Sequence, residues 1–246
     1  MPAVHSAQKL LIVRLMTLVT FAIPQESRAF VAARRRSGLA RGEEITVAHT
    51  GIGLSAASRS VRGLLEKHAP AALVSAGFAG ALEPRLRVGD VLVATNHSAA
   101  EWVQRCQELW KADTRVFFAE LTTSEHAIAS AAEKAALFRT TGAAAVDMET
   151  SAIAEACSGA GVPMLALRVI SDTAHTALPL PFDVSYDLIR QRPRPAAVAY
   201  YLLRHPGSIA PLTRFIRHLG VAREELARCL MELLSDGARN PRTPDT

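Results

Sequence analysis

Short apolar runs alternate with helix-like stretches along this chain, and no other feature of the sequence limits the fold as much. The runs are rich in leucine or β-branched residues and end at Gly, Pro or Asp, so they are predicted to be strands: 18–23, 45–49, 72–76, 91–94, 144–148 and 164–170. Helices are predicted between them over 54–68, 124–138 and 151–158. This order is typical of a mostly parallel, mixed central sheet covered by helices on both faces, a three-layer α/β/α fold.

The length and composition fit one large domain. The chain has 246 residues, of which 49% are hydrophobic and 21% charged, as in ordinary globular proteins and unlike disordered ones. We expect an N-terminal extension (1–15), a main α/β domain (16–178), and a proline-rich connection with C-terminal helices packed on the same domain (179–246). In this helical appendage, Pro206 and Pro211 are predicted to mark a joint.

Cysteine and charge patterns exclude several classes of site. Cys106, Cys157 and Cys229 are far apart and form no CxxC pair, so buried free thiols are predicted and a zinc site is not. The formal charge of +5 and the arginine run 34–36 raise the alternative of a nucleic-acid partner. No recognition motif with interleaved aromatic residues accompanies them, so no nucleic-acid partner is expected.

Residues 1–23 partly resemble a secretory signal, since Lys9 and Arg14 precede the apolar run 15–23. No small-residue cleavage site follows that run, and it also fits a buried strand that ends at Pro24. The run is too short to cross a bilayer as a helix. We therefore expect a strand here and a cytoplasmic protein.

Acidic residues and glycines follow several predicted strands, namely Glu26, Gly77, Gly80, Glu149 and Asp172. Ligands of open α/β sheets bind beyond the carboxyl ends of the strands, so these residues are candidates for a binding site. Each also has an ordinary structural role, because glycines make turns and acidic residues cap helices. Taken together, they predict one cleft.

Four segments occur in a characteristic order: AIPQE (22–26), GIGLSAA (51–57), SAGFAGAL (75–82) with VGDV (88–91), and AVDMETSAI (145–153) with VPMLALRVISD (162–172). The last pair is the most specific of them. In order and spacing, from residue 16 to about 175, the chain resembles the nucleoside phosphorylase and nucleosidase superfamily, and in particular the methylthioadenosine/adenosylhomocysteine nucleosidases. The resemblance implies the phosphorylase/hydrolase-like three-layer fold and cleavage of the bond between a purine and ribose. It implies no cofactor, no metal and a homo-oligomer, namely a dimer.

A narrower resemblance involves the residues after Asp172 and the tail segment LRHPG (203–207). They are similar to the hopanoid-biosynthesis enzymes that remove adenine from adenosylhopane. This likeness implies an adenine nucleoside with a lipid 5′ substituent and peripheral contact with the inner membrane. A purine nucleoside phosphorylase and a methylthioadenosine/adenosylhomocysteine nucleosidase are the alternatives.

The resemblance also implies the catalytic roles. Asp172 matches the acid that protonates the departing base, Glu26 matches the residue that activates water, and Arg168 matches one that positions it. The alternative for Asp172 is a turn cap, and an arginine inside a strand needs a carboxylate neighbour in any case. A nucleoside-binding protein without activity needs no acid and base together, so Glu26 and Asp172 argue for an enzyme.

Further matched positions are predicted to bind substrate. Glu149 corresponds to the residue that binds the ribose hydroxyls, and Met148 lies against the sugar. A core Met148 and a solvated Glu149 in a first helical turn are the alternatives. Asp147 stands where related nucleosidases have glutamate, and Ser171 precedes the acid. The segment that stacks on the base offers two candidates: His126, for which a solvent-facing place at a helix start is the alternative, and Ile128.

The attacking group is predicted to be water. Phosphorolytic relatives surround their anion with several arginines and hydroxyl side chains, whereas the matching loop here, 76–81, is apolar. Phe78 stands where related nucleosidases have a small hydroxyl residue. Backbone N–H groups of Gly51 and Gly80 keep phosphate open as the alternative.

The tail 200–234 mixes apolar residues with Arg204, Arg214 and Arg217. That mixture fits either an interfacial membrane surface or an ordinary amphipathic helix pair packed on the domain.

Overall fold

The computed structural model describes residues 16–37 and 45–239, so the predicted extension 1–15 lies outside the described residues. The described chain forms an eight-stranded sheet with the order β2-β1-β3-β8-β4-β5, to which β7 adds beside β3 and β6 beside β7. The strands are β1 (Thr17–Phe21), β2 (Ile45–His49), β3 (Ala72–Ala81), β4 (Val91–Ala94), β5 (Val116–Ala119), β6 (Leu121–Thr123), β7 (Ala145–Asp147) and β8 (Met164–Asp172). Two pairings, β4 with β8 and β3 with β7, are antiparallel, so the sheet is mixed and mostly parallel, as predicted.

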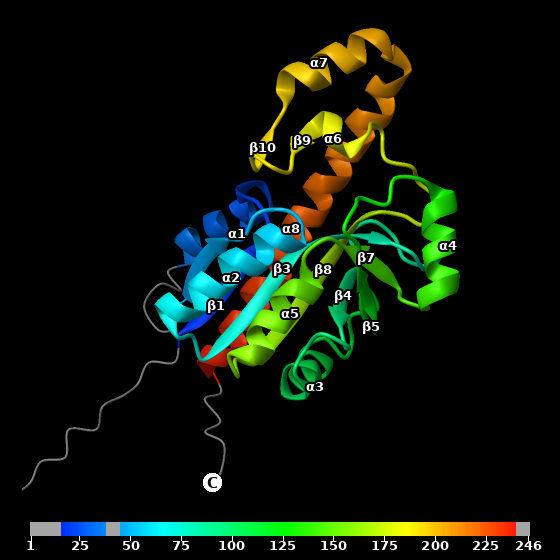
Figure 1. The fold of residues 1–246 in the computed structure, drawn as a ribbon. Helices are drawn as coiled ribbons and strands as arrows, with labels where there is room; N and C mark the ends of the chain where they lie inside the picture. The colour runs from blue at the N-terminus through cyan, green and yellow to red at the C-terminus, as the bar shows by residue number, and fades with distance from the viewer. Residues whose placement is uncertain (1–15, 38–44, 240–246) are drawn as a thin grey trace, which may run out of the picture.

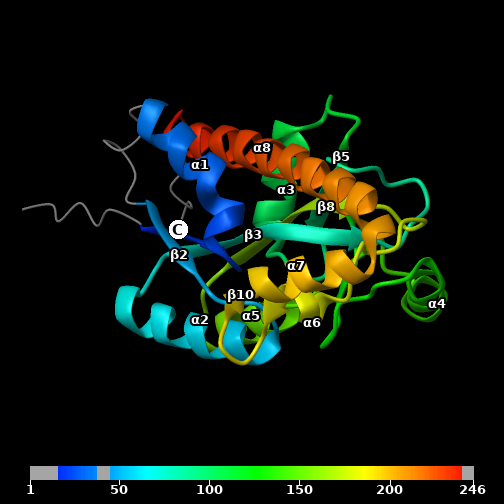
Figure 2. The same cartoon turned by 90° about the horizontal axis from the view of Figure 1, so that it is seen from above.

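Helices cover both faces of this sheet (Figures 1 and 2). One face packs against α1, α3 and α8, and the other against α2 and α5. The side chains of β8 alternate between these layers: Leu165, Leu167 and Val169 face the first, whereas Ala166 and Ile170 face the second. The helices of the main domain are α1 (Pro24–Ser37), α2 (Leu54–His68), α3 (Ala100–Leu109), α4 (Ala131–Thr141) and α5 (Thr150–Gly159). This arrangement confirms the predicted three-layer α/β/α fold.

Two central strands are longer than predicted. The segment 76–81 was expected to form a loop because of its glycines, but it continues β3, which pairs with β8 as far as Gly80. The register shifts between Ala79 and Gly80, where β8 carries the additional residue Ser171. Glycine suits this strand because carboxylate side chains of the pocket lie against it and leave little room for a Cβ atom, as described below.

The predicted helix 124–138 begins too early. Helix α4 starts after Ser130, whose side chain accepts a hydrogen bond from the N–H of Glu133 while the Glu133 carboxylate binds the N–H of Ser130. This capping box fixes the start of the helix. Residues 124–130 are therefore a loop, and His126 lies in it rather than at a helix start.

The C-terminal segment divides into a projecting part and a buried part. An arch, defined here as residues 182–221, stands above the sheet (Figure 1) and contains α6 (Phe182–Ser185), β9 (Tyr186–Asp187), β10 (Arg192–Pro193), α7 (Pro195–Arg204) and the 3₁₀ turn η2 (Pro206–Ser208). Helix α8 (Ile209–Arg239) begins in the arch and then runs down one face of the sheet, where Leu226, Leu230 and Leu233 are fully buried. The second half of the appendage is thus part of the core. Pro206 lies between α7 and α8, and Pro211 lies in the first turn of α8, where a missing N–H costs no hydrogen bond.

Candidate active site

A pocket of about 290 Å³ opens where the arch faces the end of the sheet. It brings together ten of the predicted site residues: Glu26, Phe78, Gly80, His126, Ile128, Asp147, Met148, Glu149, Ser171 and Asp172. Two others, Gly51 and Arg168, do not line it. The pocket therefore lies where the sequence predicts a cleft, and it unites residues from β3, β7, β8, α1 and the loop before α4.

Glu26 lies in the first turn of α1 and is buried. Its Oε2 accepts hydrogen bonds from the N–H groups of Ala22 (2.9 Å) and Ile23 (3.4 Å). Burial raises the pKa of Glu26 from 4.5 to about 6, although the charge of Arg168 and the backbone donors oppose this shift. A carboxylate with such a pKa can accept a proton close to neutral pH, as a general base must.

Two glycines of β3 make room for the carboxylates of the pocket. A Cβ atom at Gly77 would lie 3.5 Å from Oε1 of Glu26, and one at Gly80 would lie 3.0 Å from Oδ2 of Asp172. The second distance is too short unless Asp172 moves. Gly80 therefore contributes by its lack of a side chain, which lets the Asp172 carboxylate lie against the strand.

Asp172 is held by two neighbours at the end of β8. Its Oδ1 accepts a hydrogen bond from Ser171 Oγ (2.7 Å), and its Oδ2 forms an ion pair with Lys134 Nζ. Lys134 comes from the first turn of α4 and is fully buried. Its ammonium also donates to the carbonyl oxygens of Thr173 (2.8 Å) and Thr176 (2.9 Å), so all three donors are used. Lys134 thus orients the predicted acid.

Sequence reasoning missed Lys134, and no local pattern marks it. The capping box of Ser130 and Glu133 places it in a first helical turn. Only the tertiary packing of α4 against the end of β8 brings its ammonium to Asp172.

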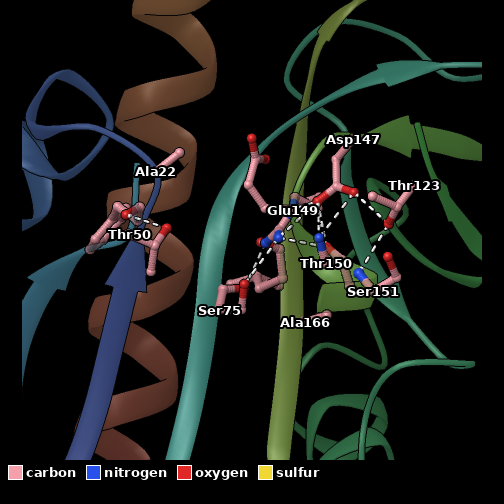
Figure 3. Close-up of polar contacts among 12 residues, drawn as sticks. Ala22, Thr50, Ser75, Thr123, Asp147, Glu149, Thr150, Ser151 and Ala166 are labelled. Carbon is pink, nitrogen blue, oxygen red and sulfur yellow. Dashed lines mark hydrogen bonds and ion pairs between the residues drawn. The ribbon is translucent and has the colours of Figure 1, made fainter. Parts of the chain in front are cut away.

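Arg168 is buried inside β8 and belongs to a polar network. Ser75, Asp147 and Thr150 of this network are labelled in Figure 3. The Arg168 guanidinium forms an ion pair with Asp147 (2.9 Å) and donates to Ser75 Oγ (3.0 Å), the Ser75 carbonyl (2.7 Å) and Thr150 Oγ1 (2.6 Å). The Asp147 carboxylate also accepts from Thr150 and from Thr123. The carboxylate neighbour that an arginine inside a strand was expected to need is Asp147. Both side chains are fully engaged in holding β7, β8 and α5 together.

A second, small cavity lies between Glu26 and Arg168. Its volume is about 10 Å³, roughly that of one water molecule, and Ser75 and Glu149 contribute to its wall. Thr20 of β1 also lines it, and its buried Oγ1 has no hydrogen-bond partner among the described residues. Buried polar atoms usually have a partner, so the hydroxyl of Thr20 and the Glu26 carboxylate form a place suited to one water.

Glu149 follows β7 and faces the pocket from the opposite wall. Its Oε1 accepts a hydrogen bond from the N–H of Gly53 (2.8 Å), which has the left-handed φ of 90° that favours glycine. Burial and the nearby charge of Asp147 raise the pKa of Glu149 from 4.5 to about 8. Glu149 therefore carries a proton at neutral pH and can both donate and accept hydrogen bonds toward a diol.

Gly51, whose N–H group kept phosphate open as the alternative, does not line the pocket. Its N–H already donates to the carbonyl of Ala22 (3.0 Å). The neighbouring peptide of Ile52 is occupied too, because Gln191 Oε1 accepts from its N–H (2.8 Å) and Gln191 Nε2 donates to its carbonyl (2.9 Å). Gln191 lies in the turn between β9 and β10, so these two bonds fasten the arch to the rim of the pocket.

Comparison with known proteins places this geometry in a family. The family model described as the phosphorylase superfamily matches residues 15–108 and 98–204. The chain belongs to the phosphorylase superfamily. This membership confirms the sequence-based assignment to the nucleoside phosphorylases and nucleosidases, enzymes that cleave N-glycosidic bonds.

Similar proteins within the phosphorylase superfamily include a 5′-methylthioadenosine/S-adenosylhomocysteine nucleosidase of Shewanella sediminis (strain HAW-EB3). It is 28% identical over 175 residues, which cover 60% of this chain and 76% of the relative. The structure of futalosine hydrolase from Helicobacter pylori strain 26695 superposes with a TM-score of 0.68 and 16% identity, covering 91% of this chain and 98% of that one. A nucleosidase structure from S. pneumoniae gives a TM-score of 0.64 and 19% identity, with 89% and 98% coverage.

The ion pair of Lys134 and Asp172 yields a stability prediction for this superfamily member. Lys134→Met should lower the free energy of unfolding by about 3 kcal/mol or more, because it leaves a buried carboxylate and two carbonyl groups without their donor. Urea unfolding measures the effect. Lys67→Met, a control at an exposed lysine of α2, should change stability by no more than about 0.5 kcal/mol. Equal effects of the two substitutions would contradict a buried ion pair.

The raised pKa of Glu149 yields a pH dependence. Between about pH 4.5 and 8 the folded protein holds a proton on Glu149 that the unfolded chain releases, so stability should fall as pH rises through this window. Glu149→Gln should remove most of that slope and leave the part below about pH 6 that comes from Glu26. Glu155→Gln, at an exposed position of the same helix, should preserve it. Thermal unfolding across this pH range tests the assignment, which fails if Glu149→Gln keeps the full slope.

Proposed function

We propose that this chain hydrolyses the N-glycosidic bond of an adenine nucleoside that carries a large apolar 5′ substituent, such as adenosylhopane. The observation that carries the proposal is the placement of Glu26 and Asp172 in one pocket, over positions 77 and 80 of the same strand. A general base and a general acid are both needed when water displaces a purine from a sugar.

The residues divide the reaction between them. Water held beside Glu26 and Thr20 attacks C1′ of the ribose and loses a proton to the Glu26 carboxylate. The bond from C1′ to the base breaks with its electron pair going to the purine, and Asp172, which takes up a proton when substrate binds, delivers that proton to the departing base. Lys134 then pairs again with the carboxylate that forms. Glu149 binds the ribose hydroxyls, Met148 lies against the sugar, and His126 and Ile128 flank the base.

Hydrolysis is favoured over phosphorolysis by the charges around the site. No arginine or lysine among the described residues lines the main pocket. Arg168 lines the small cavity, but Asp147, Ser75 and Thr150 already bind its guanidinium. A phosphate dianion needs charge-assisted donors, and none of these is left to bind it. The relatives from Shewanella and Helicobacter are also named as a nucleosidase and a hydrolase.

The apolar 5′ substituent is supported by the roof of the pocket. With Ser185 as its polar side chain, the wall contributed by the connection and the arch is mostly apolar: Leu178, Leu180, Phe182, Val198, Leu212 and Phe215. Such a wall excludes water from a hydrocarbon chain and gives few hydrogen bonds to a polar one. Phe78 adds a further apolar surface beside Glu26.

The proposal includes a homodimer in the cytoplasm, peripheral to the inner membrane, where a substrate of this kind resides. The second candidate function is 5′-methylthioadenosine/S-adenosylhomocysteine nucleosidase, which the curated relatives favour by name.

The acid role of Asp172 predicts a large loss of rate. Asp172→Asn keeps the shape of the side chain but delivers no proton, so turnover should fall roughly 100-fold or more while substrate binding changes little. Adenine release is measured in phosphate-free buffer, with ribosyl product analysis, so that water is tested as the attacking group. Asp113→Asn is the control, at a half-buried position that pairs with Arg228 and does not line the pocket, and it should retain normal turnover. Near-normal turnover of folded Asp172→Asn, or strict dependence on phosphate, would contradict the mechanism.

The apolar roof predicts a preference for long substituents. A 5′-alkyl adenosine should have a higher kcat/KM than adenosine or methylthioadenosine, by roughly fourfold for each methylene that becomes buried. Phe215→Ser should reduce this preference by roughly tenfold and leave adenosine turnover unchanged. The neighbouring Ile216→Ser, at a position exposed on α8, should keep the preference. A higher kcat/KM for unmodified adenosine would remove the apolar substituent from the proposal and leave the nucleosidase chemistry in place.

A further inference from the structure

Large apolar side chains that face solvent are confined to one segment of the described chain. All seven of them lie between residues 188 and 221, in the arch: Leu188, Ile189, Tyr200, Leu203, Ile209, Ile216 and Val221. Single exposed apolar residues are common on proteins, but seven within one segment and none elsewhere mark a surface that meets something other than water.

The charged side chains of residues 188–221 are all positive. Residues 188–221 contain six arginines and no aspartate or glutamate: Arg190, Arg192, Arg194, Arg204, Arg214 and Arg217. All six are exposed, and Asp187 pairs with Arg190 at 3.1 Å. The apolar groups therefore lie within a positive field.

Helix α7 shows why this surface is unusual. Its inner side lines the pocket through Val198, as expected for a helix packed on a domain. Its outer side is apolar as well, because Tyr200 is 58% and Leu203 is 82% exposed. Arg204 lies at the end of the helix with its guanidinium 4.9 Å from the ring centre of Tyr200. A helix that is apolar all round is normally buried, whereas the outer side of α7 is exposed to water.

The arch is also the roof of the proposed active site. Leu212 and Phe215 of α8 line the pocket, while Ile209 and Ile216 of the same helix are exposed to solvent. Within the described residues, no helix is long and apolar enough to cross a membrane. A contact made by this face would therefore lie along a surface and next to the pocket.

We propose that the outer face of the arch docks on an anionic phospholipid bilayer. The exposed apolar side chains enter the interface between headgroups and acyl chains, and the arginines bind the lipid phosphates. The docking itself follows from this face alone. Its use, delivery of a membrane-embedded nucleoside to the pocket beneath, rests on the proposed function.

A second copy of the chain fits this face less well. A twofold interface brings the same surface of both copies together, so the six arginines would meet six identical arginines, with only Asp183 and Asp187 as acidic residues in the whole arch. An anionic bilayer has the opposite charge and takes up the apolar groups as well.

The test is cosedimentation of the full chain with vesicles. Binding to vesicles of phosphatidylglycerol and phosphatidylcholine should be at least tenfold stronger than binding to phosphatidylcholine alone, and it should weaken in high salt. Arg204→Gln with Arg217→Gln should weaken it roughly 30-fold, since each arginine near an anionic surface contributes about a fivefold factor. Leu203→Ser should weaken the binding that persists in high salt.

The matched control replaces two exposed arginines of α1, Arg35→Gln with Arg36→Gln. They lie in the last turn of α1, a helix that Figure 2 shows away from α7, and their replacement should leave vesicle binding unchanged. Turnover of a soluble short-chain nucleoside should be the same in every variant.

Three results would overturn the docking surface. One is equal binding to anionic and neutral vesicles, and another is an equal loss in the α1 control. The third is dimerisation in sedimentation analysis that Leu203→Ser abolishes, without any vesicle binding, because the face would then belong to a second copy. A chain that binds anionic vesicles but prefers unmodified adenosine keeps the docking surface and overturns the apolar substituent instead.

Discussion

The buried ion pair of Arg168 and Asp147 is the interaction on which the site depends. It joins the centre of β8 to the end of β7, and through Thr150 it fixes the start of α5. Glu149 lies between the end of β7 and the start of α5, so the fixed positions of these two elements direct its side chain into the pocket. Removing either charge would leave the other buried and unpaired in the middle of the sheet, which costs far more than the pair contributes.

The same pair sets the electrostatics of the carboxylates around it. Glu26, Asp147 and Glu149 share a buried region in which Arg168 is the cation, and Asp147 is its direct partner. Asp147 therefore largely neutralises the charge of Arg168, and burial is the main influence on the pKa values of Glu26 and Glu149. Because Arg168 pairs with Asp147, Glu26 and Glu149 keep the raised pKa values that their burial causes.

Much of this could be predicted from the sequence, because strand ends and periodicity are local signals. The strand edges, the positions of Glu26, Glu149 and Asp172, and the layered fold follow from apolar runs and from their order. Lys134, Thr20 and Gln191 could not be predicted, since each acts on a residue far away in the chain. The glycines of β3 misled the prediction because glycine usually breaks a strand, whereas here it clears space for the carboxylates of Glu26 and Asp172.

The two hydrogen bonds of Gln191 to the Ile52 peptide have a consequence for how such an enzyme diversifies. The floor of the pocket comes from residues before 173, whereas its roof comes from a later segment, which Gln191 fastens to the opposite rim. The part of the roof before α8 pairs with no strand of the main sheet, so its length can change while the floor is kept. Selection on what the pocket admits can therefore proceed separately from selection on the bond it breaks.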